Sequence, residues 1–139
     1  MKNILHTSNL TSLKKIYQGK VRDVYEIDNE NILIVATDRV SVFDVILPTP
    51  IPNKGIILNQ VSNFWFKKFE NLIENHTSPL NIDNINLTNE EFNEIEGRFI
   101  RAKKLKALPV ESIVRSYLIG SGYSDYLSKN TNDQYVNYV

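Results

Sequence analysis

Residues 18–37 read QGKVRDVYEIDNENILIVAT, and this stretch decides the fold. Residues 19–27 alternate in the way that predicts a half-buried strand. One side of that strand carries Val21, Asp23, Tyr25 and Ile27, and the other carries Lys20, Arg22, Val24 and Glu26. Turn-forming residues follow at 28–31, and the β-branched apolar run at 32–37 predicts a buried second strand. The stretch therefore predicts a β-hairpin.

Two cations follow the glycine at the start of this hairpin. Gly19 would allow backbone amides to approach an anion closely, and Lys20 and Arg22 share one face of the strand. The spacing matches neither G-x-x-x-x-G-K-[ST] nor G-x-G-x-x-G. From the pattern alone, a solvated strand face is favoured over a phosphate site.

The rest of the chain predicts helices and strands in mixed order. Apolar residues at helical spacing predict a helix over 56–76, and we expect Phe64, Trp65 and Phe66 to pack in the core rather than to line a cofactor site. A capping-box pattern begins a short helix over 88–95, and a strand follows over 98–105. Residues 109–119 are ambiguous, and 123–129 could restart a helix. The order of the elements predicts an α+β fold with a mostly antiparallel sheet and a packed helix.

Composition narrows the class of protein. The 139 residues carry 16 basic and 16 acidic side chains, so no basic excess points to nucleic acid. There is no cysteine, which removes disulfides and thiolate metal sites and makes the cytoplasm the expected compartment. No apolar run approaches the roughly 20 residues of a membrane helix. His6 and His76 have no second ligand at metal spacing, so neither predicts a metal site.

Two further stretches carry candidate site residues. In ATDRVSVFD, residues 36–44, four polar side chains follow the apolar strand: Asp38, Arg39, Ser41 and Asp44. A ligand site and a local Asp38–Arg39 pair that organises a turn are equally compatible with this pattern. In residues 102–122, Glu111 and Arg115 lie four apart in an apolar run and need either each other or a ligand, and GSG at 120–122 could contact an anion.

Together these stretches resemble one family. GKVRDVYEID, VATDRVSVFDVILPTPIPNKGIILNQVSNFWF and LPVESIVRSYLIGSGYSDY are similar to the phosphoribosylaminoimidazole-succinocarboxamide (SAICAR) synthases, in family order, from about Tyr17 to about Tyr126. The resemblance implies an ATP-grasp or kinase-like nucleotide-binding domain over residues 1–106. Residues 107–139 would begin a second domain, for substrate and metal. Val42 and Ser116 depart from the family's usual Ala and Gly.

The resemblance also implies roles for individual residues. The ATP-binding residues would be Gly19, Lys20, Val21, Arg22, Lys104, Lys106, Ala107 and Leu108. Of these, Lys20, Arg22 and Lys104 would be the catalytic cations. Glu111, Arg115 and Ser121 would bind the ribotide, and Asp38, Arg39, Ser41 and Asp44 would lie on the side of the second substrate, L-aspartate. With these assignments, the phosphate interpretation of Lys20 and Arg22 becomes the favoured one.

The implied activity is an ATP-dependent ligation in purine biosynthesis. ATP would phosphorylate the carboxylate of a carboxylated aminoimidazole ribotide, and the amine of L-aspartate would attack the acyl phosphate. Family members continue past the length of this chain, so the chain resembles their N-terminal portion, and the Mg²⁺ ligands are expected outside it. A nucleotide-binding fragment without catalysis and an unrelated α+β interaction domain remain alternatives. The sequence indicates no oligomeric state.

Overall fold

The computed structural model describes residues 4–79, 81–110, 112–114 and 116–129. The chain divides into two compact units, residues 1–106 and 107–139. The first unit contains every described strand, and the second contains one described helix, α3 (Ser121–Lys129). What each unit does remains a prediction. None of the described helices is both long enough and apolar enough to cross a membrane.

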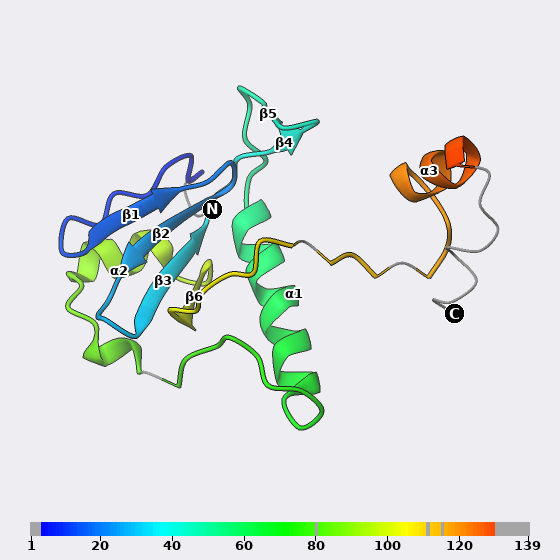
Figure 1. Ribbon diagram of the computed structural model, residues 1–139. Coiled ribbons are helices and arrows are strands. Elements are labelled where there is room, and N and C mark those ends of the chain that lie inside the picture. The colour runs from blue at the N-terminus through cyan, green and yellow to red at the C-terminus, as the bar shows by residue number, and fades with distance from the viewer. Residues whose placement is uncertain (1–3, 80, 111, 115, 130–139) are drawn as a thin grey trace. The chain divides into compact units, whose positions relative to one another are not determined.

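The first unit is built on a four-stranded antiparallel sheet in the order β1-β2-β3-β6 (Figure 1). Its strands are β1 (Lys14–Gln18), β2 (Arg22–Glu26), β3 (Asn31–Ala36) and β6 (Phe99–Lys103). β2 and β3 form the hairpin that residues 18–37 predict, with Asp28 accepting hydrogen bonds from the backbone N–H groups of Glu30 and Asn31 at its turn. The predicted α+β class with an antiparallel sheet is confirmed.

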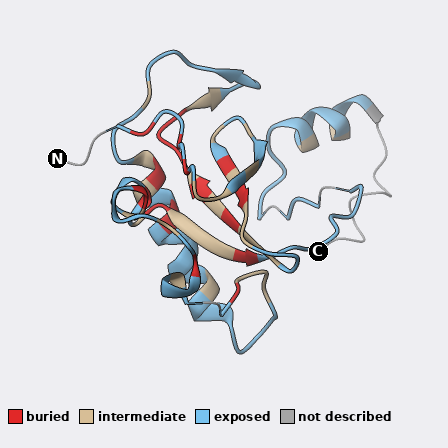
Figure 2. Ribbon diagram, turned by 90° about the vertical axis from the view of Figure 1, so that its left-hand side faces the viewer, coloured by how far each residue is buried: buried red, intermediate tan, exposed pale blue. Residues whose placement is uncertain are grey.

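One face of this sheet forms the hydrophobic core. The alternation of β2 and β3 buries Tyr25, Leu33 and Val35 completely. Their partners are Leu5 and Leu10 of the N-terminal segment, Ile85 after the short helix η1 (Ile82–Asn84), and Ile95 of α2 (Asn89–Ile95). Figure 2 shows these buried positions concentrated along the sheet and the segments beside it. The capping box predicted at Thr88 and Glu91 begins α2.

The opposite face is only half-buried, and we call it the open face. Its centre is a cross-strand row of Val24, Ile34 and Ile100, which are direct partners across three strands. The predicted long helix is α1 (Lys54–Phe69), which begins and ends earlier than expected and packs against β3 and β6. A Cβ atom on Gly55 would lie 2.3 Å from the carbonyl oxygen of Ala36, so the close approach of this helix requires glycine.

The expected core packing of the aromatic residues of α1 is partly wrong. Phe66 is half-buried and stacks edge-on against His76. Phe64 and Trp65 are 58% and 45% exposed. The helical spacing correctly predicts an apolar stripe, but no other described part of the first unit covers it.

Two short strands, β4 (Ser41–Val42) and β5 (Val45–Ile46), form a hairpin between β3 and α1. Phe43 and Asp44 at its tip both have positive φ angles, of 46° and 68°. Such a turn matches the right-handed twist of the two strands that it joins. The prolines of residues 48–52 follow directly and end the pairing.

Candidate functional site

The loop between β1 and β2, residues 19–21, is the first part of the site. The Gly19 N–H donates to the Arg22 carbonyl at 2.7 Å, and both the N–H and the hydroxyl of Thr37 donate to the Val21 carbonyl at 3.0 and 2.9 Å. A Cβ atom on Gly19 would lie 3.2 Å from the ring of Tyr17. The loop is therefore tight, and it is fixed to the end of β3.

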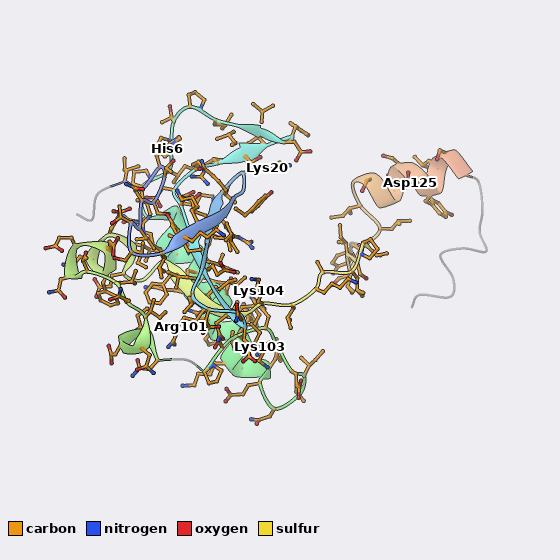
Figure 3. All side chains as sticks on the ribbon, turned by 60° about the vertical axis from the view of Figure 1, so that its left-hand side comes forward. His6, Lys20, Arg101, Lys103, Lys104 and Asp125 are labelled. Carbon is orange, nitrogen blue, oxygen red and sulfur yellow. The ribbon has the colours of Figure 1, made fainter. Side chains whose placement is uncertain are left out.

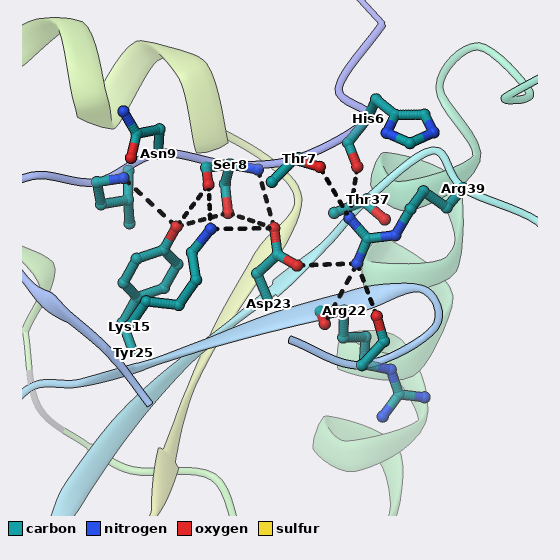
Figure 4. Close-up of polar contacts among 12 residues, drawn as sticks. His6, Thr7, Ser8, Asn9, Lys15, Arg22, Asp23, Tyr25, Thr37 and Arg39 are labelled. Atoms are coloured by element: carbon teal, nitrogen blue, oxygen red, sulfur yellow. Dashed lines mark hydrogen bonds and ion pairs between the residues drawn. The ribbon is translucent and has the colours of Figure 1, made fainter. Parts of the chain in front are cut away.

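The guanidinium of Arg39 lies against this loop (Figure 4). Its Nε donates to the Lys20 carbonyl at 2.9 Å, and its Nη2 donates to the carbonyls of Gly19 at 2.9 Å and Arg22 at 3.4 Å. Nη1 donates to the His6 carbonyl. Arg39 is 1% exposed, so this charge needs an acidic partner.

Asp23, on the core face of β2, is that partner. Its Oδ1 lies 2.8 Å from Nη2 of Arg39, and its Oδ2 accepts from both the N–H and the hydroxyl of Ser8. Burial alone would raise the pKa of Asp23, but the hydrogen bonds from Arg39 and Ser8 outweigh it and hold the pKa below its usual value. The alternation places Asp23 on the core side, but it does not identify the partner.

Asp38 has the same kind of surroundings. Its carboxylate accepts from the N–H of Leu5, from the N–H of Gly55 and from Nη1 of Arg98, each within 2.8–2.9 Å. Burial would raise the pKa of Asp38, and these hydrogen bonds lower it below its usual value. The side chain joins the N-terminal segment to the first turn of α1.

These contacts correct two interpretations of the segment 36–44. Asp38 and Arg39 do not form the local pair, because each has its own buried partner from another part of the chain. They are also 0% and 1% exposed, so neither lies where it would touch a substrate. Their position after a buried strand correctly marks a polar cluster, but its role in this structure is to hold backbone.

Ser41 and Asp44 lie nearer the surface, on the β4–β5 hairpin. Asp44 is exposed, and its Oδ1 accepts a hydrogen bond from Nζ of Lys20 at 2.5 Å. This hydrogen bond lowers the pKa of Asp44. The contact crosses from the glycine loop to the hairpin, so the predicted ATP-binding lysine and the predicted substrate-side aspartate are neighbours. Both side chains are more than half exposed, so the pair contributes little to stability.

A cavity of about 180 Å³ lies between the open face and α1. Its lining includes the cations Arg22 and Lys54, the hydroxyl-bearing Thr37, and the apolar Ile34 and Ile100. Burial is the largest cause that lowers the pKa of Lys54, and the positive charges of Arg22 and Arg39 lower it further. The negative charge of Asp38 acts in the opposite direction. The sequence motifs do not identify Lys54 as a candidate site residue. The only available signal is a lysine directly before Gly55 at the start of the long helix.

Lys104 lies at the other end of the sheet (Figure 3). It follows β6, and its Nζ lies 2.6 Å from Oε1 of Glu26, the last residue of β2, whereas Arg22 is the first. The two ends of β2 are roughly 13 Å apart at about 3.3 Å per residue. Lys20 and Arg22 therefore lie at one end of β2, and Lys104 does not lie with them as a third catalytic cation.

The remaining predicted residues lie beyond β6. Lys106 is exposed at the end of the first unit, and Ala107, Leu108 and Ser121 are exposed in the second unit. Glu111 and Arg115 lie outside the described residues. No group of three or more His, Cys, Asp or Glu side chains that could hold a metal ion occurs in the part of the chain that the structure describes.

Comparison with known proteins agrees with the sequence motifs. Residues 15–137 match the family model of SAICAR synthetase. Phosphoribosylaminoimidazole-succinocarboxamide synthase of Thermodesulfovibrio yellowstonii is 54% identical over 91% of this chain and 43% of its own length. The synthase of Thioalkalivibrio sulfidiphilus is 50% identical, with the same coverage. The chain thus spans less than half the length of these curated relatives.

Solved structures give the same result. The SAICAR synthase of Saccharomyces cerevisiae complexed with SAICAR superposes with a TM-score of 0.83 at 37% identity, over 91% of this chain and 46% of that one. A type-2 SAICAR synthetase in complex with ADP, at 22% identity and a TM-score of 0.52, shares the fold. The sheet, the fixed glycine loop and the cation-lined cavity define an α+β domain suited to binding an anionic ligand. The chain belongs to the SAICAR synthetase family.

Proposed function

We infer that this chain is the nucleotide-binding portion of an ATP-dependent ligase that joins L-aspartate to carboxyaminoimidazole ribonucleotide. The observation that carries this proposal is the family match over residues 15–137, which includes the glycine loop and the open face. A cytoplasmic setting, expected from the absence of cysteine, belongs to the same proposal.

The open face suggests how ATP would lie. The apolar row of Val24, Ile34 and Ile100 offers a surface for the adenine base, and positive charge lies at both ends of it. Lys20, Arg22 and Lys54 would meet the phosphates at the glycine-loop end. Lys104 would then lie at the adenine end, next to the predicted linker 106–108. This orientation gives the separated cations different tasks along one ligand.

The chemistry follows from the substrates. A carboxylate oxygen of the ribotide would attack the γ-phosphorus of ATP, so that an acyl phosphate forms and ADP leaves. The aspartate amine would attack the acyl carbon, the C–O bond to phosphate would break, and the amine proton would pass to solvent or phosphate. Lys20 and Arg22 would offset the negative charge that spreads over the transferred group. Mg²⁺ would add positive charge at the phosphates, and its protein ligands are expected outside the described residues, which hold no group of three or more acidic, His or Cys side chains that could bind a metal ion.

Fewer contacts among the described residues bear on the binding of L-aspartate and the ribotide. Asp44 pairs with Lys20, and Ser41 lies on the same β4–β5 hairpin, so these two residues remain the candidates for the aspartate side of the site. Glu111, Arg115 and Ser121 remain predicted ribotide contacts. The narrower alternative, a nucleotide-binding segment without catalysis, is favoured by the 43% share of the relatives' length that this chain spans.

ATP binding tests the first half of the proposal. Isothermal titration of the 139-residue chain should detect ATP, and Lys20→Ala should weaken binding about tenfold, since one charge-assisted hydrogen bond is lost. Lys14→Ala, which removes an exposed cation from β1, is the matched control and should leave the affinity unchanged. Equal affinities for wild type and Lys20→Ala would contradict the phosphate assignment.

Ligation tests the second half. The chain alone should form no product from ATP, L-aspartate and the ribotide, because it spans 43% of its relatives' length. A chimera that joins residues 1–139 to the part of the Thermodesulfovibrio yellowstonii relative outside the match should form the succinocarboxamide, detected by mass spectrometry. Turnover by the chain alone would refute the first expectation. An inactive but folded, ATP-binding chimera would favour the non-catalytic alternative.

A further inference from the structure

The glycine loop is held by contacts that the sequence motif does not reveal. The guanidinium of Arg39 donates to three carbonyls at the turn between β1 and β2, those of Gly19, Lys20 and Arg22. A planar guanidinium can bond several acceptors in fixed directions, whereas an ammonium group is a single point charge. The buried side chain therefore fixes the direction in which three peptide groups of one short loop point.

Two backbone N–H groups of the glycine loop have no acceptor within the described part of the chain. Among the described residues, no hydrogen bond is made by the backbone N–H of Lys20 or of Val21. The carbonyls of Gly19 and Lys20 accept hydrogen bonds from Arg39, so the free groups of these peptides are the N–H donors of Lys20 and Val21. Successive free N–H groups in a tight loop form a concavity that favours an anion.

The guanidinium is itself held in place. Asp23 pairs with it at 2.8 Å and is fixed in turn by two hydrogen bonds from Ser8, whose hydroxyl also meets that of Tyr25. Asp23 and Ser8 are fully buried. Because the whole chain of contacts lies in the core, the loop is anchored to the hydrophobic core rather than to the surface.

We propose that Arg39 is the positioning residue of the glycine loop: it turns the loop carbonyls inward so that the loop presents backbone N–H groups to the phosphates of a nucleotide. The proposal rests on the proposed nucleotide-binding function and adds to it a residue that never touches the ligand. Arg39 would thus support the phosphate-binding loop from within the core. This role replaces the contact with L-aspartate that the family resemblance implies.

The experiment compares two buried arginines. Arg39→Lys keeps a charge beside Asp23, but its three N–H donors cannot serve Asp23 and all three carbonyls together. Arg98→Lys is the matched control, because Arg98 is also 1% exposed and pairs with a buried aspartate at 2.9 Å, but it bonds no loop carbonyl. Each variant is titrated with ATP and with adenosine, which lacks the phosphates. Arg39→Lys should lose about tenfold in ATP affinity with adenosine affinity unchanged, and Arg98→Lys should change neither.

Amide hydrogen exchange without nucleotide provides a second, independent measurement. Exchange of the Gly19 amide, whose N–H donates to the Arg22 carbonyl at 2.7 Å, should accelerate in Arg39→Lys relative to the amides of β3, and it should not accelerate in Arg98→Lys. Equal loop exchange in the two variants would overturn the positioning role even if ATP binds. If wild type binds no ATP, the proposed function fails, and the exchange comparison still decides the role of Arg39. Should Arg39→Lys not fold, the double variant Asp23→Asn/Arg39→Gln, which removes both charges of the buried pair, is compared in the same way.

Discussion

Arg22 and Lys54 bring two positive charges to one cavity of the open face. Like charges repel, and burial lowers the pKa of Lys54, so this arrangement costs free energy in the absence of an anion. No ion pair to either side chain is present among the described residues of the chain. Paired cations with no acidic partner, in a half-enclosed space, are typical of a site that binds phosphate.

Lys54→Ala should therefore weaken ATP binding by about five- to twentyfold, since a charge-assisted contact to phosphate contributes roughly 1–2 kcal/mol. Adenosine should bind as before, because the change lies at the phosphate end. Isothermal titration calorimetry measures the affinity of each variant for ATP and for adenosine. The control is Lys67→Ala in the last turn of the same helix, where the cation lies outside the cavity lining. A parallel loss in both variants would mean that general charge, and not this site, attracts ATP.

The residue scale also shows where sequence reasoning stops. The alternation predicts a strand over 19–27 that contains Gly19, Lys20 and Arg22, whereas in the structure the strand begins at Arg22 and the other two lie in the loop before it. The partners of the buried charges are 16 residues apart for Asp23 and Arg39 and 60 apart for Asp38 and Arg98. No periodicity encodes such pairs, because they depend on how strands and loops pack in three dimensions.

At the scale of elements, α2 and the N-terminal segment are joined through one carboxylate. Glu91 accepts from the N–H of Ser12 at 2.9 Å, from the hydroxyl of Thr11 at 3.0 Å and from the N–H of Thr88 at 2.9 Å. These bonds, the contact with Ser12 first, lower the pKa of Glu91 to about 2. A seven-residue helix has little stability of its own, so this contact helps to hold it over the core.

The lowered pKa predicts acid sensitivity of this contact. A carboxyl group whose pKa is lower when folded adds stability above its unfolded value of 4.5, and that stability is lost as the pH falls toward about 2. Glu91→Gln should reduce the free energy of unfolding by roughly 1–3 kcal/mol at pH 7, and the difference from wild type should shrink at pH 2–3. Urea titrations followed by circular dichroism measure both, with Glu90→Gln as the exposed control. A difference that is constant with pH would contradict the assignment.

Most elements follow from local sequence, because their signals are local. The hairpin of residues 18–37, the capping box at Thr88 and the strand predicted over 98–105 are all present, and the strands β2 and β6 are shorter than predicted. The stretch 109–119, ambiguous by pattern, contains no helix or strand in its described residues. The burial of α1 was not predictable, because a helical stripe shows which face is apolar but not whether another element covers it.

At the scale of the whole molecule, the apolar stripe of α1 is the most consequential feature of the first unit. Leu58, Val61, Trp65 and Phe69 are between 41% and 51% exposed, and the rings of Trp65 and Phe69 stack at a centroid distance of 5.4 Å. Soluble monomers rarely expose a contiguous apolar surface of this kind. Water contact with this stripe favours any association that buries it.

We therefore expect the 139-residue chain to self-associate as its concentration rises, because two such stripes can bury each other. Sedimentation velocity should show a concentration-dependent increase in mean mass for wild type. Val61→Lys/Phe69→Lys should shift the chain to monomer, since lysines at these exposed positions disfavour burial of the stripe while leaving the core intact. Gln60→Lys, an exposed polar position on the same helix, adds charge outside the stripe and should leave association unchanged. A wild-type chain that stays monomeric over the same concentrations would show that the stripe alone does not drive association, and equal effects of Gln60→Lys would point to net charge as the cause.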